Sequence, residues 1–323
     1  MQGKIAVEEH LVGPSFQDQV RPTPFWFDDY SRDVRERMLD VGEQRLRDMD
    51  DSGIERMVLS VAAPAIQDEL DTARAVELAT RANDELAALI RTRPDRYSGF
   101  ATLPMQDPAA AAGELERAVA EHGFVGALVN GYTSTGTLDT PAYYDEPRFL
   151  PFWERLAALD VPFYLHPRNP LPNQQRIYQG RPELLGAPWA FAIETATHAL
   201  RLITSGLFDR VPKATVVLGH LGELLPFAID RVQSRLSHAK AVKLAKRPAQ
   251  YLRENFYIST SGNFHTPSLI GAIAQMGAER VLFSVDYPFE KLQDGSRWLD
   301  SAPISDSDRE KIGRTNAQRL LGI

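Results

Sequence analysis

The stretch Lys4-Ile5-Ala6-Val7-Glu8-Glu9-His10 begins as an apolar strand and ends in two possible metal ligands. Side chains of an extended chain repeat every second residue on one face, so Glu8 and His10 are expected to point the same way and Glu9 the other way. A carboxylate and an imidazole that project together can hold a divalent cation if other strands supply further ligands. The rest of the chain decides whether this stretch is a solvated strand end or part of a metal site.

Composition restricts the class of protein. With 323 residues, 43% of them hydrophobic, the chain can build a large core and suits an α/β barrel of ~250 residues plus insertions. The net charge of −7 and the lack of a long Lys/Arg run argue against nucleic-acid binding. No apolar run reaches the ~18 residues of a membrane span, and the N-terminus lacks the layout of a secretory signal. The absence of cysteine excludes disulfides and thiolate chemistry, and we expect a cytoplasmic enzyme.

Eight apolar segments alternate with helical ones along the chain, among them a predicted helix over 221–245. Parallel strands buried on both faces appear as near-continuous apolar runs, so the pattern predicts an α/β fold, a (β/α)8 TIM barrel, as one domain over residues 1–323. Neither a Gly-x-Gly-x-x-Gly motif after the first strand nor a Walker loop is present, so no nucleotide or other organic cofactor is expected. The predicted strands are 4–10, 54–62, 97–103, 124–130, 161–166, 214–220, 256–261 and 280–286.

Two long segments interrupt this alternation. Residues 11–40 carry several prolines and the aromatic cluster Phe25-Trp26-Phe27, and residues 167–188 are rich in Pro and Asn. Loops of this length are usually functional or disordered, so we expect both to be active-site loops. A surface loop held by its own aromatic residues is the alternative for the first.

Polar residues gather at the predicted strand ends, where barrels of this kind carry their chemistry. Three of the seven histidines terminate strands. Two imidazoles and two carboxylates from the first, fifth and eighth strands face one mouth and suit Zn²⁺, Mn²⁺ or Fe²⁺. The alternative is a set of independent capping or solvated residues. The four candidate ligands are Glu8, His10, His166 and Asp286.

A second pair lies in the turn Gly219-His220-Leu221-Gly222-Glu223. A carboxylate three residues after a histidine can orient its ring and raise its basicity, so Glu223 is expected to act on His220. A helix-start carboxylate beside an unrelated histidine is the alternative.

These motifs resemble the amidohydrolase-2 branch of the metal-dependent amidohydrolase superfamily. Within it, the chain is most similar to the ortho-hydroxybenzoate decarboxylases, the group of the γ-resorcylate (2,6-dihydroxybenzoate) decarboxylases. The resemblance covers nearly the whole chain. It rests on residues 3–10 (GKIAVEEH), 126–131 (GALVNG), 161–170 (VPFYLHPRNP), 219–223 (GHLGE), 260–264 (TSGNF) and 282–290 (LFSVDYPFE).

The resemblance implies one divalent metal, Mn²⁺ or Zn²⁺ rather than Mg²⁺, held by Glu8, His10, His166 and Asp286. Hydrolytic relatives end the first strand in His-x-His, whereas Glu8 stands in the first position here, as in the decarboxylases. Binuclear relatives carry a bridging lysine or glutamate at the fourth strand. This chain has Asn130 there, which implies a single metal.

The implied activity is the reversible, non-oxidative decarboxylation of an ortho-hydroxybenzoate in aromatic compound catabolism, with 2,6-dihydroxybenzoate as the best candidate. Asp286 would protonate the ring carbon, and His220 with Glu223 would adjust the phenolic proton. Asn130 would bind a second ring substituent. Arg231 matches a family arginine on the substrate side, with a surface salt bridge as the alternative.

Two departures leave the substrate open. The family usually reads Trp-Arg-Ile-Asp around Arg231, where this chain reads Asp-Arg-Val-Gln, and Ala62 stands where relatives carry asparagine. Two other functions also stay open: a lactone or amide hydrolase on the same barrel, and an inactive binding barrel. The expected partners are a small aromatic carboxylic acid and further copies of the chain, as a dimer or tetramer, with no nucleic acid and no membrane.

Overall fold

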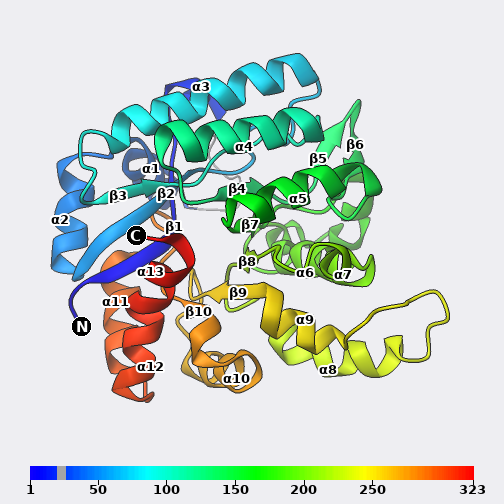
Figure 1. Ribbon diagram of the computed structural model, residues 1–323. Coiled ribbons are helices and arrows are strands. Elements are labelled where there is room, and N and C mark those ends of the chain that lie inside the picture. Colours follow the sequence, from blue (N-terminus) through cyan, green and yellow to red (C-terminus); the bar gives the residue numbers. More distant parts are fainter. Residues whose placement is uncertain (20–26) are drawn as a thin grey trace.

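The computed structural model describes residues 1–19 and 27–323, whose parallel strands form a barrel (Figure 1). The strands lie in two sheets, of order β1-β2-β3 and β10-β9-β8-β7-β4. Bridges between Ala101 and Ala127 and between Glu9 and Tyr287 join the sheets on either side, so the predicted barrel is confirmed. The barrel strands are β1 (Lys4–Leu11), β2 (Ile54–Val61), β3 (Tyr97–Gly99), β4 (Ala127–Asn130), β7 (Phe163–His166), β8 (Val216–Leu218), β9 (Phe256–Ser259) and β10 (Val281–Leu282).

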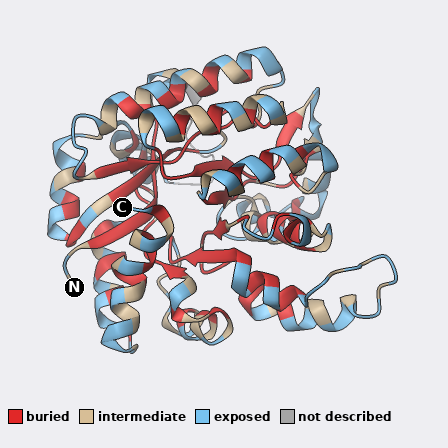
Figure 2. Ribbon diagram, viewed as in Figure 1, coloured by how far each residue is buried: buried red, intermediate tan, exposed pale blue. Residues whose placement is uncertain are grey.

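Helices surround the strands, buried where they face the barrel and exposed on the outside (Figure 2). Asp107 caps α4 by accepting hydrogen bonds from Ala109 N and Ala110 N, and Gly123 ends it at φ 67°. None of the helices in the described ranges is long and apolar enough to cross a membrane. The helices are α1 (Asp28–Leu39), α2 (Glu43–Asp51), α3 (Thr72–Ile90), α4 (Pro108–His122), α5 (Leu150–Leu159), α6 (Ala190–Thr204), α7 (Leu207–Arg210), α8 (Leu225–Leu236), α9 (Pro248–Asn255), α10 (Thr266–Met276), α11 (Leu292–Ser301), α12 (Asp306–Glu310) and α13 (Asn316–Leu321).

The core has an inner and an outer layer. Inside the barrel, Ile5 and Val7 of β1 pack with apolar residues of the other strands, and α13 adds Leu321 to this cluster. Ala6, between them, belongs instead to the larger cluster under the surrounding helices. Alternation along β1 therefore places odd-numbered residues inward at its start.

A bulge in β1 changes this alternation before the strand ends. Ala6 pairs with Met57 and Glu9 pairs with Leu59, so β1 uses one residue more than β2 over the same distance. Without the bulge, Glu8 would follow Ala6 to the outside of the barrel. The extra residue turns Glu8 inward directly after Val7, a known use of bulges beside active sites.

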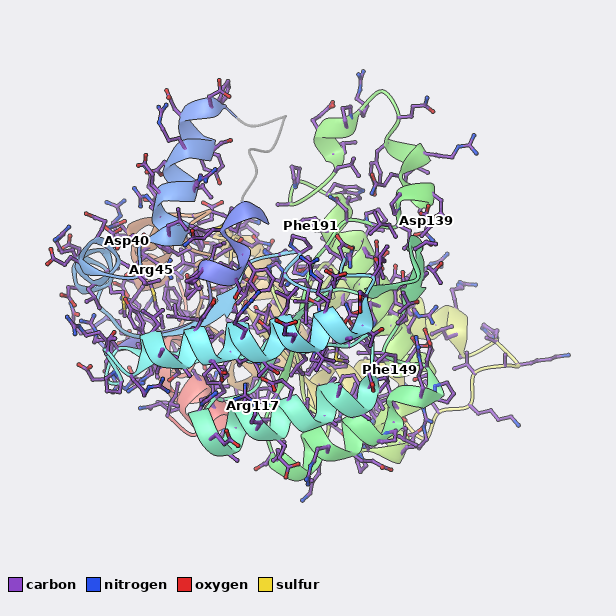
Figure 3. The ribbon with its side chains drawn as sticks, turned by 90° about the horizontal axis from the view of Figure 1, so that it is seen from above. Asp40, Arg45, Arg117, Asp139, Phe149 and Phe191 are labelled. Atoms are coloured by element: carbon purple, nitrogen blue, oxygen red, sulfur yellow. The ribbon has the colours of Figure 1, made fainter. Side chains whose placement is uncertain are left out.

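Several predicted elements differ from those observed. Residues 11–40 are not irregular throughout, because they contain the 3-10 helix η1 (Pro14–Gln19) and α1; Phe25 and Trp26 lie outside the described residues. Residues 167–188 hold only the short 3-10 helices η3 (Pro172–Tyr178) and η4 (Pro182–Leu184). The predicted helix 221–245 ends at Leu236, and an antiparallel hairpin of β5 (Thr133–Thr135) and β6 (Thr137–Ala142) follows β4 unpredicted. In Figure 3, α1 projects from the same side of the molecule as η3, which lies beside the labelled Asp139.

Two glycines test how tightly the barrel wall is packed. Gly126 precedes β4 at φ +148°, and a Cβ on it would lie 2.5 Å from the carbonyl oxygen of Pro162. Gly126→Ala should therefore lower the free energy of unfolding by about 1–3 kcal/mol. Gly113→Ala is the matched control: apart from its chain neighbours and the backbone of its own helix, no atom of the described chain lies within 4 Å of the new methyl group. In the middle of α4 it should raise stability by about 0.5–1 kcal/mol. Urea unfolding of both variants measures the difference, and equal effects would contradict the packing described.

Candidate metal centre

Four side chains from the barrel mouth converge on one point. Glu8 and His10 lie on β1, His166 ends β7, and Asp286 follows β10. One ligand atom from each lies within 4.8 Å of the corresponding atoms of the other three. His10 Nε2 is 3.3 Å from Asp286 Oδ1, and His166 Nε2 is 3.5 Å from Glu8 Oε1. The structure thus brings together the four residues that the sequence nominated.

The donor atoms of this cluster suit a divalent cation. Glu8 and His10 are fully buried, and Glu8 Oε1 and His10 Nε2 make no hydrogen bond with any residue in the described part of the chain. Burying a carboxylate oxygen without a partner is costly, and a cation bound at Oε1 would remove that cost. Two imidazoles with two carboxylates are a common donor set for Mn²⁺, Fe²⁺ or Zn²⁺. The residues therefore fit the metal that the sequence implied.

His220 lies at the edge of the cluster and is held by Glu223. The His220 Nδ1 atom is 2.6 Å from Glu223 Oε1, and Glu223 is itself buried. The other ring nitrogen, Nε2, lies 3.6 Å from Asp286 Oδ2 and 3.8 Å from Glu8 Oε1. The carboxylate thus fixes which edge of the ring faces the four ligands.

The turn that carries His220 and Glu223 is unusual backbone. Left-handed conformations cost free energy for residues other than glycine and gather at functional sites. Here they serve to point His220 into the mouth while Glu223 reaches back beneath it. Five consecutive residues adopt them: His220 (φ 52°), Leu221 (φ 58°), Gly222 (φ 85°), Glu223 (φ 51°) and Leu224 (φ 67°).

Charges in the cluster separate the pKa values of its members. Burial raises the pKa of Asp286, but the neighbouring charged rings of His10 and His220 lower it more, so this carboxyl ionises well below its usual range. Burial lowers the pKa of His220, but the Glu223 and Glu8 carboxylates raise it more, so the pKa of this ring ends well above its usual range. Burial and the charge of His10 hold the pKa of His166 well below normal. The pKa values of His220 and Asp286 are thus displaced in opposite directions.

The three predicted substrate contacts differ in position. Asn130 ends β4 beside His166, is buried, and its Oδ1 has no hydrogen-bond partner among the described residues. Ala62 follows β2 and packs in an apolar cluster against which Phe289 lies. Arg231 is exposed on α8, and no hydrogen bond or ion pair in the described chain joins it to the other predicted residues.

Sequence reasoning missed Glu9, which faces away from the cluster yet shapes it. Its carboxylate accepts hydrogen bonds from Val285 N at 2.9 Å and Tyr287 N at 2.8 Å, on either side of Asp286, and from Ser284 Oγ at 2.8 Å. Burial raises the pKa of Glu9 to about 7, although these hydrogen bonds act to lower it. Asp286 itself has φ 75°, so Glu9 holds an otherwise unfavourable backbone in place.

Arg45 of α2 was also missed. It is fully buried, donates from Nη2 to the carbonyl oxygen of His10 at 2.8 Å and lies 4.7 Å from the ring centre of Tyr287. Its Nε donates to the carbonyl oxygen of Asp40 at 3.0 Å, and Figure 3 shows the two residues side by side. Arg45 thus supports the backbone of one ligand, a role that its place in a polar helical sequence did not indicate.

Comparison with known proteins agrees with this geometry. An amidohydrolase family model matches residues 26–323. The γ-resorcylate decarboxylase of Rhizobium radiobacter is 52% identical over 327 residues, covering 100% of this chain and 99% of that protein. A crystal structure of 2,6-dihydroxybenzoate decarboxylase with 2,6-dihydroxybenzoate superposes with a TM-score of 0.96 at 51% identity over 100% of both chains. The dihydroxybenzoic acid decarboxylase of Polaromonas sp. JS666, with bound manganese and the inhibitor 2-nitroresorcinol, also gives 0.96, at 49% identity over 100% of this chain and 97% of that one. This chain belongs to the amidohydrolase family.

Proposed function

We propose that this protein is a metal-dependent carboxy-lyase that converts 2,6-dihydroxybenzoate to resorcinol and CO₂ without an oxidant. The observation that carries the proposal is the buried Glu8/His10/His166/Asp286 cluster with the His220–Glu223 pair at its edge. Its support is the full-length similarity to decarboxylases of this acid, one of them with its substrate and another with manganese. We propose a single Mn²⁺ at the cluster, with Zn²⁺ as the other candidate.

The chemistry requires two contributions. When bound, the cation would act as a Lewis acid that holds and polarises the carboxylate and the neighbouring phenolate of the substrate. The residues of the chain must then deliver a proton to the carboxyl-bearing ring carbon, because direct loss of CO₂ would leave a strongly basic aryl carbanion. Once that carbon is protonated, the bond to CO₂ breaks and its electron pair restores the aromatic ring.

Asp286 is the proposed proton donor and His220 the group that supplies it. The lowered pKa of Asp286, the raised pKa of His220 and the distance of 3.6 Å between His220 Nε2 and Asp286 Oδ2 support this assignment. In this proposal the proton passes from His220 to Asp286 and then to the ring carbon of the substrate. Asp286 therefore carries the proton only during the reaction. Glu223 stabilises the charged ring before the transfer.

Asn130 is proposed to bind the second ring hydroxyl, since its buried Oδ1 has no partner in the described chain. Ala62 is proposed as part of the wall beside the ring. Arg231 is exposed on α8, so no substrate contact is proposed for it within a single copy of this chain.

The direct test is turnover of a panel of acids by protein reconstituted with Mn²⁺. The panel contains 2,6-, 2,3- and 2,4-dihydroxybenzoate and 2-hydroxybenzoate, with CO₂ and the phenol both quantified. We expect 2,6-dihydroxybenzoate to give the highest kcat/KM and equal amounts of CO₂ and resorcinol. Metal-loaded protein that decarboxylates none of the four, or that hydrolyses lactones instead, would overturn the proposal.

Two substitutions separate metal binding from proton transfer. His166→Ala removes a neutral ligand and should reduce metal content after dialysis to near zero. Asp286→Asn keeps an oxygen at the same place but has no acidic proton, so kcat should fall by at least about 100-fold even in protein that retains metal. Atomic absorption measures the first effect and steady-state kinetics the second. Near-normal turnover by Asp286→Asn would show that another group protonates the ring.

We also propose that the protein forms a homo-oligomer, a dimer or a tetramer. Support comes from large apolar side chains that stay exposed around the β5–β6 hairpin and the 167–193 segment. They are Leu138 at 47%, Ile177 at 79%, Leu184 at 40%, Trp189 at 46% and Ile193 at 39% exposure. Light scattering would measure the assembly, and a monomer at micromolar concentration would contradict it. Cytoplasmic location stays a prediction that cell fractionation can test.

A further inference from the structure

The two carboxylate oxygens of Glu8 have different surroundings. Oε1 faces the ring nitrogens of the cluster, 3.5 Å from His166 Nε2 and 3.8 Å from His220 Nε2, and has no hydrogen-bond partner in the described chain. Oε2 points the opposite way and accepts hydrogen bonds from three hydroxyl groups. These belong to Tyr164, to Ser261 and, at 3.2 Å, to Ser259.

The three hydroxyl groups, here called the hydroxyl cradle, form one connected unit. Tyr164 OH lies 2.7 Å from Ser259 Oγ, which lies 2.8 Å from Ser261 Oγ. Ser261 Oγ also accepts a hydrogen bond from His220 N at 3.1 Å. All three residues are fully buried, so no water competes for these donors. The cradle therefore ties the orientation of Glu8 to β7, to β9 and to the turn that carries His220.

Sterics close the remaining side of the carboxylate. A Cβ on Gly219 would lie 2.8 Å from Glu8 Oε2 and 3.1 Å from Ser261 Oγ, so glycine leaves just enough space for the cradle. A carboxylate oxygen has two lone pairs, which the hydroxyls of Tyr164 and Ser261 suffice to saturate, and Ser259 Oγ lies 3.2 Å away as a third donor. Only Oε1 remains available to a cation.

We infer that Tyr164, Ser259 and Ser261 are positioning residues that restrict Glu8 to metal ligation through Oε1 alone. The inference rests on the proposed metal site and extends it. Carboxylates bind cations through one oxygen or two. Glu8 bound through both would fill an additional position on the cation and leave one fewer for the carboxylate and phenolate of an ortho-hydroxybenzoate. The cradle thus keeps the site open for a chelating substrate.

The test compares two tyrosine-to-phenylalanine variants of barrel strands. Tyr164→Phe removes a donor to Glu8. Tyr97→Phe removes the hydroxyl of a buried tyrosine of β3 that donates to Val41 O at 3.2 Å rather than to Glu8. Ser259→Ala and Ser261→Ala are smaller changes that keep the inference testable if Tyr164→Phe fails to fold. Each purified, metal-free variant is titrated with Mn²⁺ and followed by electron paramagnetic resonance.

We expect Mn²⁺ to bind about 10–100-fold more weakly to Tyr164→Phe and Ser261→Ala, the range typical when hydrogen bonds to a metal ligand are removed. The spectrum of the bound ion should change, and KM for the acid should rise more than kcat falls. Tyr97→Phe should match the wild type in Mn²⁺ affinity, in the spectrum of the bound ion and in its kinetic constants. Unchanged Mn²⁺ affinity and spectrum in all cradle variants would overturn the inference and leave the metal site intact. Wild-type protein that binds no Mn²⁺ would overturn the metal site and, with it, this inference.

Discussion

The buried carboxylate of Glu8 is the constraint on which the mouth of the barrel depends. It is fully buried, one oxygen lies among three imidazole rings and the other accepts hydrogen bonds from three hydroxyls. A charge in such a place is stable only when every lone pair has a partner. Hydroxyl donors supply the partners on one side. The other side is left for a cation, which accounts for the positions of His10, His166 and Asp286 around the same point.

Unusual backbone at three places serves this arrangement. The bulge in β1 turns Glu8 inward, the left-handed residues 220–224 aim His220, and Asp286 sits at φ 75°. Hydrogen bonds from side chains hold two of them: Ser261 Oγ accepts from His220 N, and the Glu9 carboxylate accepts from the residues flanking Asp286. Unfavourable backbone conformations that the surrounding fold holds in place are typical of functional sites.

The pKa values follow from the same geometry and suit proton transfer to a ring. His220 Nε2 and Asp286 Oδ2 lie 3.6 Å apart, and their surroundings displace the pKa values of the two residues in opposite directions. Pairs of titratable groups whose pKa values are separated in this way are typical of active sites, which supports the roles proposed for His220 and Asp286. The predicted resemblance to decarboxylases, confirmed by the relatives, thus has a physical counterpart in this chain.

The sequence by itself determined the barrel, because buried parallel strands need continuous apolar runs and helices need their caps, and both are local patterns. It also nominated Glu8, His10, His166, Asp286 and the His220–Glu223 pair, because strand ends of a barrel must meet at one mouth. Only the tertiary structure decided the β1 bulge, the support from Glu9 and Arg45, and the hydroxyl cradle of Tyr164, Ser259 and Ser261. Apart from the contact between Ser259 and Ser261, these depend on hydrogen bonds between residues more than 30 positions apart, as Glu8 and Ser261 illustrate at a separation of 253. No periodicity within a single segment records such contacts.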